Sequence, residues 1–134
     1  MLKDLCARLP YGVKLNADYI DFNRNGKLFS INNNKELILS PERGYPFDVA
    51  IEKCKPYLFP LSSMTEEQQA EFDRTYANDM IVVSDNLKNR LDGQPYEMNL
   101  GHYRHIDWLN ANHFDYRGLI EKGLALDATG KNIY

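Results

Sequence analysis

The chain has 134 residues, of which 43% are hydrophobic, 26% charged and 12% aromatic, a composition typical of a globular protein and not of a disordered one. Its formal net charge is -3, so it lacks the general excess of lysine and arginine that binding to a phosphate backbone requires. We therefore expect one domain over residues 1–134 and disfavour DNA or RNA as its partner.

The N-terminal segment predicts a short helix. Leu2, Leu5, Cys6 and Leu9 recur at helical spacing, and Pro10 then stops the helix. These side chains should pack onto a sheet. The second cysteine, Cys54, is far from any metal-binding or redox spacing, so both cysteines are expected to be reduced core residues.

A β-meander is predicted next, from pairs of apolar residues that alternate with polar ones. Asn25-Gly26 fits a type I′ hairpin turn after the second pair, and the asparagine-rich stretch 32–35 fits another turn. The apolar pairs are Val13 with Leu15, Ile20 with Phe22, Phe29 with Ile31, and Leu37 with Leu39. This pattern predicts an α+β fold built on three or four antiparallel strands.

Prolines at positions 41, 46, 56 and 60 exclude a long helix from Ser40 to Met64. Within this stretch, Val49 to Lys53 is interpreted as a short strand or a single helical turn. The sequence KPYLFPLSSM is interpreted as an extended crossing segment, because residues before proline avoid the α region.

Helices should follow in the second half. Thr65-Glu66-Glu67-Gln68 is a capping box, which starts a helix at Glu66 with Phe72 and Tyr76 on its apolar edge. Residues 77–92 fit either a strand or a helix, and the spacing of their apolar residues favours helix up to Gly93 and Pro95. A last helix is expected from Tyr103 to Asn112, burying Ile106, Leu109 and part of Trp108, so that C-terminal helices pack on the sheet.

The first residues do not show the features of a secretory signal, and no apolar run approaches the ~20 residues that a membrane helix needs. A cytoplasmic protein without a membrane anchor is therefore the expectation.

All three histidines lie in one aromatic-rich stretch near the C-terminus. His102, His105, His113 and Asp115 are of the types that bind zinc or iron, so a metal-assisted hydrolase is one hypothesis. We favour a structural role, because no paired-ligand spacing such as H-E-x-x-H is present. No metal or other cofactor is therefore expected.

Tyr57, Tyr116 and Arg117 are the candidate binding residues, since tyrosine and arginine are enriched where interfaces concentrate binding energy. The structural alternative is that they cover the edge of the core and hold the turn at Gly118. A third hypothesis is a local nucleic-acid patch of Lys53, Lys55, Arg104 and Arg117, against which the acidic balance argues. No hydrolase elbow, P-loop or dinucleotide motif occurs.

Three blocks of sequence carry a resemblance: residues 2–13, 55–68 and 106–128. They resemble a family of small uncharacterised proteins encoded by gut Bacteroidetes and by their phages and mobile elements. The family implies no catalytic residue. Its members often have a second histidine and an arginine where this chain has Asn112 and Phe59, which weakens the enzyme hypothesis further. The sequence therefore predicts a non-catalytic protein that contacts another protein, and that is encoded by a phage or mobile element.

Overall fold

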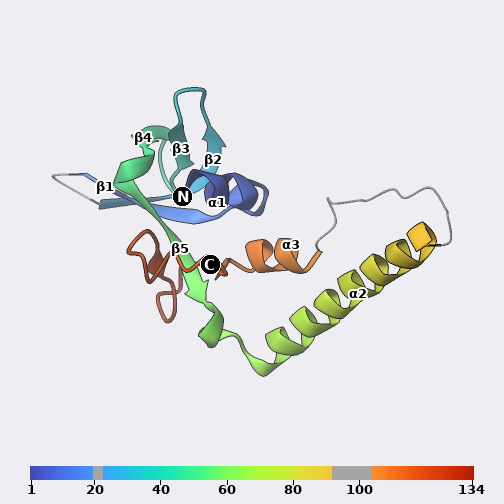
Figure 1. Cartoon of the computed structure of the whole chain (residues 1–134). Helices are drawn as coiled ribbons and strands as arrows, with labels where there is room; N and C mark the ends of the chain where they lie inside the picture. Colours follow the sequence, from blue (N-terminus) through green and yellow to red (C-terminus); the bar gives the residue numbers. More distant parts are fainter. Residues whose placement is uncertain (20–22, 92–103) are drawn as a thin grey trace. The chain divides into compact units, whose positions relative to one another are not determined.

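The computed structural model describes residues 1–19, 23–91 and 104–134, with the backbone alone for residues 81–91. Two compact units emerge from the contacts within the chain. Met1–Ser63 together with His113–Tyr134 make the first unit, and Met64–Asn112 make the second. Figure 1 labels the helices α1 to α3 and the strands β1 to β5.

The first unit is built on a sheet that confirms the predicted antiparallel meander. Among the described residues the sheet has seven strands, in the order β4-β3-β2-β1-β5-β6, with β7 also paired to β5. The strands are β1 (Lys14–Asp18), β2 (Asn23–Ile31), β3 (Glu36–Ser40), β4 (Phe47–Ala50), β5 (Cys54–Pro60), β6 (Phe114–Asp115) and β7 (Leu126–Asp127). β1 to β4 pair antiparallel in succession, β5 returns antiparallel to β1, and β6 and β7 add to β5 in parallel.

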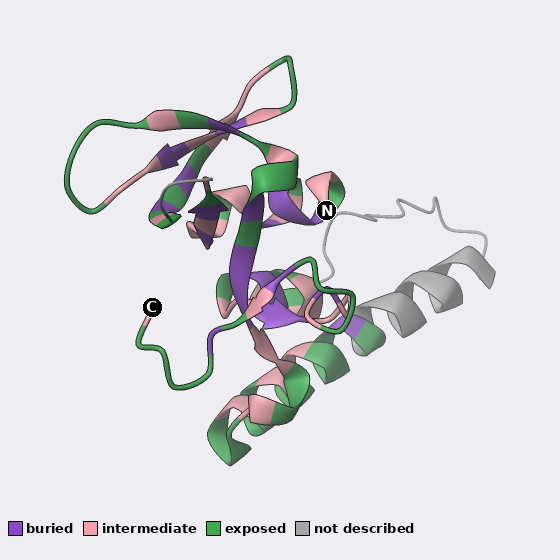
Figure 2. Cartoon of the chain, turned by 90° about the vertical axis from the view of Figure 1, so that its left-hand side faces the viewer, coloured by how far each residue is buried: buried purple, intermediate pink, exposed green. Residues whose placement is uncertain are grey.

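The core of this unit lies on one face of the meander. Period-two alternation buries Leu15 on β1 and Leu37 and Leu39 on β3, as the apolar pattern predicts. On β2 the predicted inward position of Phe29 is wrong: Phe29 is 66% exposed and Leu28 is buried, next to a shift in the pairing register with β3 between Leu28 and Ser30. Leu119 and Ala125, from the segment between β6 and β7, join the same cluster. Residues from the first strands and from the C-terminal segment thus share one hydrophobic core. Figure 2 colours the buried stretches purple.

The turn predicted at Asn25-Gly26 is wrong, because both residues lie inside β2, where they pair with Asn16 and Leu15. The connection from β1 comes earlier, between Asp18 and Asn23. Gly26 serves packing: a Cβ atom there would lie 2.8 Å from Cβ of Leu39. The strand predicted at Ile20 and Phe22 lies outside the described residues.

Other predicted turns and short elements are found. The asparagine-rich turn joins β2 to β3, with Lys35 in the left-handed region at φ 61°. Between β4 and β5 the chain makes the helical turn η2 (Ile51–Lys53), so the stretch predicted as strand or turn contains both. The extended crossing segment is β5, followed by the turn η3 (Leu61–Ser63).

Helix α1 (Leu2–Arg8) forms as predicted and is followed by the turn η1 (Leu9–Tyr11), but its buried face differs. Leu5 is buried, whereas Cys6 is exposed and the charged Asp4 and Arg8 are buried in its place. Asp4 and Arg8 form an ion pair at i,i+4, and the burial of this pair places a charged face of the helix, and not the predicted apolar face, against the core.

In the described part of the second unit the chain forms two helices, α2 (Glu66–Leu91) and α3 (Arg104–Ala111). The capping box is confirmed. The Gln68 main-chain amide donates to Thr65 Oγ1 at 3.2 Å, and the Thr65 main-chain amide donates to Gln68 Oε1 at 2.9 Å. The ambiguous residues up to Leu91 continue the same helix, while Gly93 and Pro95 lie outside the described residues. Figure 2 shows that the described part of α2 is mostly exposed. On α3, Leu109 is buried and Ile106 and Trp108 are half-buried.

Candidate functional site

His105, one of the four candidate metal ligands, is held by a carboxylate that the sequence did not bring to attention. Asp79 on α2 accepts a hydrogen bond from the His105 main-chain amide at 2.9 Å and contacts Nδ1 of its ring at 2.5 Å. Burial alone would raise the pKa of Asp79, but hydrogen bonds from the amides of His105 and Arg104 and from the His105 ring outweigh it and lower that pKa.

This contact is a helix cap supplied by another helix. Arg104 and His105 open α3, where the first amides have no partner within the helix and the dipole favours a negative charge. Asp79 provides both the acceptor and the charge. Its 26-residue separation from His105 means that no local motif could have revealed the pair.

Aromatic rings surround the same contact. Phe72 and Tyr76 of α2 lie with their ring centroids 6.3 and 5.2 Å from that of His105, both at steep angles. Trp108 lies 5.8 Å from Phe72. Such tilted ring pairs add to the burial of apolar surface, so His105 has a structural role in joining α2 to α3.

His113, a second candidate ligand, stacks on Tyr134. The two ring centroids are 3.7 Å apart and the planes differ by 11°. Burial, together with the charges of Arg8 and Lys14, lowers the pKa of His113 to about 4, so the ring is neutral near neutral pH. The backbone of His113 is left-handed, with φ 62°, and its carbonyl accepts the Phe59 amide at 2.9 Å.

Asp115, the carboxylate of the predicted metal set, binds main-chain amides. Its two oxygens accept hydrogen bonds from Leu119 and Ile120, each at 2.9 Å, which caps the turns that follow. His102 lies outside the described residues. Across residues 1–19, 23–80 and 104–134, no three His, Cys, Asp or Glu side chains gather as a metal ion would require.

Tyr116 and Arg117, two of the predicted binding residues, lie beside a buried ion pair. Arg8 donates to Asp4 at 2.8 Å and to the Phe114 carbonyl at 2.7 Å, and its side chain is fully buried. Arg117 lies 3.4 Å from the other Asp4 oxygen. Both guanidinium groups lie over the Tyr116 ring, at 5.4 Å and 5.3 Å from its centroid.

Tyr57, the third predicted binding residue, is only 8% exposed. Its hydroxyl donates to Asn25 Oδ1 at 3.1 Å, and its carbonyl accepts from the Tyr134 hydroxyl at 2.7 Å. The structure therefore places Tyr57 in the sheet, where its ring and its main chain both have partners.

The cysteines differ from one another. Cys54 is buried at the start of β5, and burial raises the pKa of its thiol to about 11, which opposes a nucleophilic role. The core position predicted for Cys6 is wrong, since that side chain is exposed on α1.

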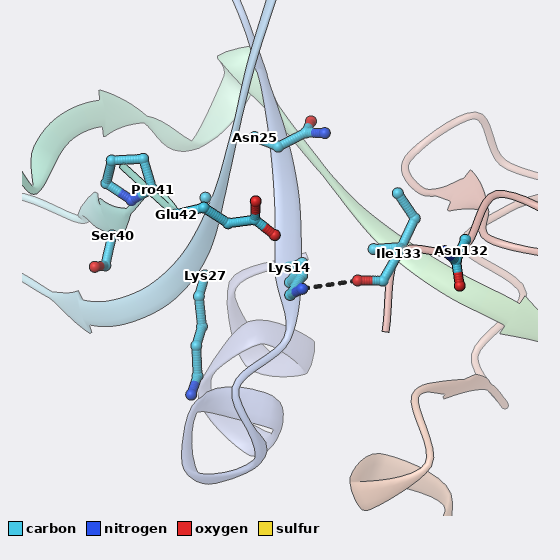
Figure 3. Close-up of a pocket in the computed structure, with 9 residues that line it drawn as sticks. Lys14, Asn25, Lys27, Ser40, Pro41, Glu42, Asn132 and Ile133 are labelled. Atoms are coloured by element: carbon cyan, nitrogen blue, oxygen red, sulfur yellow. Dashed lines mark hydrogen bonds between the residues drawn. The ribbon is translucent and has the colours of Figure 1, made fainter. Parts of the chain in front are cut away.

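A hollow of about 470 Å³ opens beside Lys14, and Figure 3 shows the residues around it. Lys14 Nζ donates to the Ile133 carbonyl at 2.7 Å, the contact drawn in the figure. The C-terminal segment therefore forms one wall, and the strands β1 and β2 with the end of β3 and the residues after it form the others. The polar side chains on its lining are Lys14, Asn25, Lys27, Ser40, Glu42 and Asn132.

The most exposed aromatic residue among the described part of this sheet unit was missed by sequence reasoning. Tyr45 is 89% exposed, in the segment between β3 and β4. Arg24 lies beside this segment: its guanidinium is 4.5 Å from the ring centroid of Phe47, and Nη2 is 3.1 Å from where a Cβ on Gly44 would lie. Only the turn-forming residues around Tyr45 could have indicated its exposure.

Comparison with protein families, with curated proteins and with solved structures finds no match for this chain. Of the helices among the residues that the structure describes, none has both the length and the apolar character that crossing a bilayer requires.

Proposed function

We propose that this chain is a non-catalytic protein that acts by contacting another protein, through the surface around Tyr45. The observation that carries the proposal is the 89% exposure of that ring within a folded sheet unit. Tyrosine and arginine are over-represented among the residues that dominate binding energy, and Arg24 lies beside the same segment.

Three described contacts of titratable groups support this proposal, because each is structural. Asp79 caps α3 through His105, His113 stacks on Tyr134, and Asp115 accepts two main-chain amides. A metal-assisted hydrolase would need these groups for chemistry. We retain Tyr116 and Arg117 as further contact residues, since both are half-buried and thus partly accessible.

The formal charge of -3 supports a protein partner over a nucleic acid. The resemblance of the three sequence blocks supports an origin in a phage or mobile element of gut Bacteroidetes, and a cytoplasmic setting in that host.

Affinity capture tests the proposal. The tagged chain is compared with Tyr45→Ser and with Leu61→Ser, which removes a 47% exposed apolar side chain elsewhere. We expect wild type and Leu61→Ser to recover the same partner in equal amounts. Titrated with that purified partner, Tyr45→Ser should bind at least about tenfold more weakly than wild type. Absence of a reproducible partner contradicts the proposed function, and equal loss in both variants contradicts the assignment to Tyr45.

A further inference from the structure

The ladder between β1 and β5 is completed by a side chain. The pairing ends where Leu15 faces Pro56, and continuing the same register would bring Lys14 opposite Tyr57. There the Lys14 amide donates to the Tyr134 hydroxyl at 3.0 Å, and this hydroxyl donates to the Tyr57 carbonyl at 2.7 Å. One phenol oxygen thus serves as acceptor and donor together, which a phenylalanine could not do.

The ring of Tyr134 is recognised as well as its hydroxyl. His113 stacks on it at 3.7 Å between centroids, Phe59 lies at 5.9 Å, and Lys14 Nζ is 5.9 Å from the ring centre. Although Tyr134 as a residue is 40% exposed, burial of its phenol raises the pKa of Tyr134 to about 12, so the hydroxyl keeps its proton and remains a donor. The surroundings select an aromatic ring that carries a hydroxyl group.

The segment that presents Tyr134 makes few further described contacts: the Lys131 amide donates to the Ala128 carbonyl at 3.2 Å, and Lys131 Nζ lies 5.9 Å from the centre of the Tyr57 ring. Residues 129–132 are exposed, and the contact nearest to Tyr134 is the bond from Lys14 Nζ to the Ile133 carbonyl. Figure 3 shows this segment as one wall of the hollow beside Lys14. One anchoring side chain and one main-chain carbonyl are the kind of contacts by which a short peptide docks on a protein.

We propose that the junction of β1 and β5 is a binding site for a peptide that presents a tyrosine side chain, occupied here by the chain's own Tyr134. A tyrosine-bearing segment of a partner takes the same place when it displaces residues 129–134. This inference rests on the proposed function only in that the ligand belongs to a protein, and it concerns a different surface from that of Tyr45.

Defined peptides test the site directly. The probe is the labelled hexapeptide TGKNIY, the sequence of residues 129–134, with blocked ends, and its control has phenylalanine in the last position. Full-length Tyr134→Ala should bind the probe at least about tenfold more tightly than wild type, in which Tyr134 competes. It should bind the phenylalanine control about tenfold more weakly than the probe, because two hydrogen bonds are lost. Leu124→Ala, which removes a 41% exposed side chain, should behave like wild type.

Equal binding of the two peptides, or equal binding of the probe to wild type and Tyr134→Ala, overturns the proposal. If Tyr134→Ala fails to fold, hydrogen exchange in Tyr134→Phe decides. The Lys14 amide should then exchange at least about tenfold faster, whereas the Leu28 amide, bonded to the Val13 carbonyl at 2.8 Å, should be unchanged. An unchanged Lys14 amide also overturns it. None of these results depends on the capture of a partner through Tyr45.

Discussion

Each of the two compact units of this chain is stabilised by a different kind of internal contact. In the unit of Met1–Ser63 with His113–Tyr134, strands from both ends of the sequence share one ladder and one apolar core. In the unit of Met64–Asn112, the described contacts between α2 and α3 are a small group of rings and one carboxylate. Stability in the first unit is therefore spread over many long-range contacts. Among the described residues of the second unit, these ring contacts and this carboxylate join the two helices.

Both units also contain a buried charged side chain. The sheet unit contains a fully buried arginine that is paired on one side and bonded to a carbonyl on the other. The helical unit contains a buried aspartate that is paired with main-chain amides. In both, a polar group in the interior fixes the position of a chain segment that local sequence could not position.

The largest effect is expected from Arg8→Met. This change leaves Asp4, which is 1% exposed, without its closest counter-charge and removes the donor to Phe114, so the free energy of unfolding should fall by about 3 to 5 kcal/mol. Chemical denaturation monitors it. The double variant Asp4→Leu with Arg8→Met should recover much of the loss, because the unpaired charge is gone. A fall of less than about 1 kcal/mol for the single variant would mean that this pair does not hold α1 to β6.

A smaller effect should follow from Asp79→Asn. The neutral side chain loses the charge at the start of α3, and we expect a loss of about 1 to 3 kcal/mol, with faster exchange of the His105 amide. Asp73→Asn is the matched control, since its described bond is to Gln69 on the helix surface. If the amides of β1 and β3 lose protection from hydrogen exchange by the same factor as those of α3, the two units unfold together. In that case the two units do not differ in stability.

The pH dependence of the sheet unit gives the next test. The pKa of His113 is about 4 in the folded chain and ordinarily 6.5, so below pH 6.5 the unfolded chain binds a proton that the folded chain does not. Stability should therefore fall as pH drops from about 6.5 to about 4. We expect a change on the order of 1 to 2 kcal/mol, less than the full shift implies because solvent reaches part of the ring.

His113→Asn removes this titration and suits the left-handed backbone, since asparagine adopts positive φ readily. The variant should be less stable at neutral pH, having lost the stack on Tyr134, but its stability should change less between pH 6.5 and 4. Denaturation curves at fixed ionic strength measure both. Parallel loss of stability in the two proteins would assign the pH dependence to other groups.

Local signals in the sequence predicted much of this fold. The alternation at Leu37 and Leu39 gave a strand, and the capping box at Thr65 and Gln68 gave a helix start, because each depends on neighbours in the chain. Asn25-Gly26 was misassigned since a glycine required for close packing on Leu39 has the same sequence signature as one required for a turn.

The candidate site was harder to predict, because its contacts join distant residues. Lys14 and Tyr134 are 120 positions apart, and Asp79 and His105 are 26 apart, so no spacing in the sequence encodes either pair. Burial of Arg8 likewise depends on the Phe114 carbonyl, although its ion pair with Asp4 at i,i+4 is visible in the sequence.

The smallest effect should come from Thr65→Ala at the start of α2. Loss of the hydroxyl leaves the Gln68 amide without its cap, at a cost of about 0.5 to 1 kcal/mol. Thr75→Ala is the control: that hydroxyl donates to the Glu71 carbonyl within the same helix, where alanine is at least as favourable. Exchange should accelerate in the first turn of α2 and nowhere in the sheet. Because α2 has few described tertiary contacts, its first turn should depend strongly on this cap. Helix α1 has no side-chain cap at its start, so it should depend less on local bonds. Loss of protection confined to the first turn of α2 would support that contrast, and no change there would refute it.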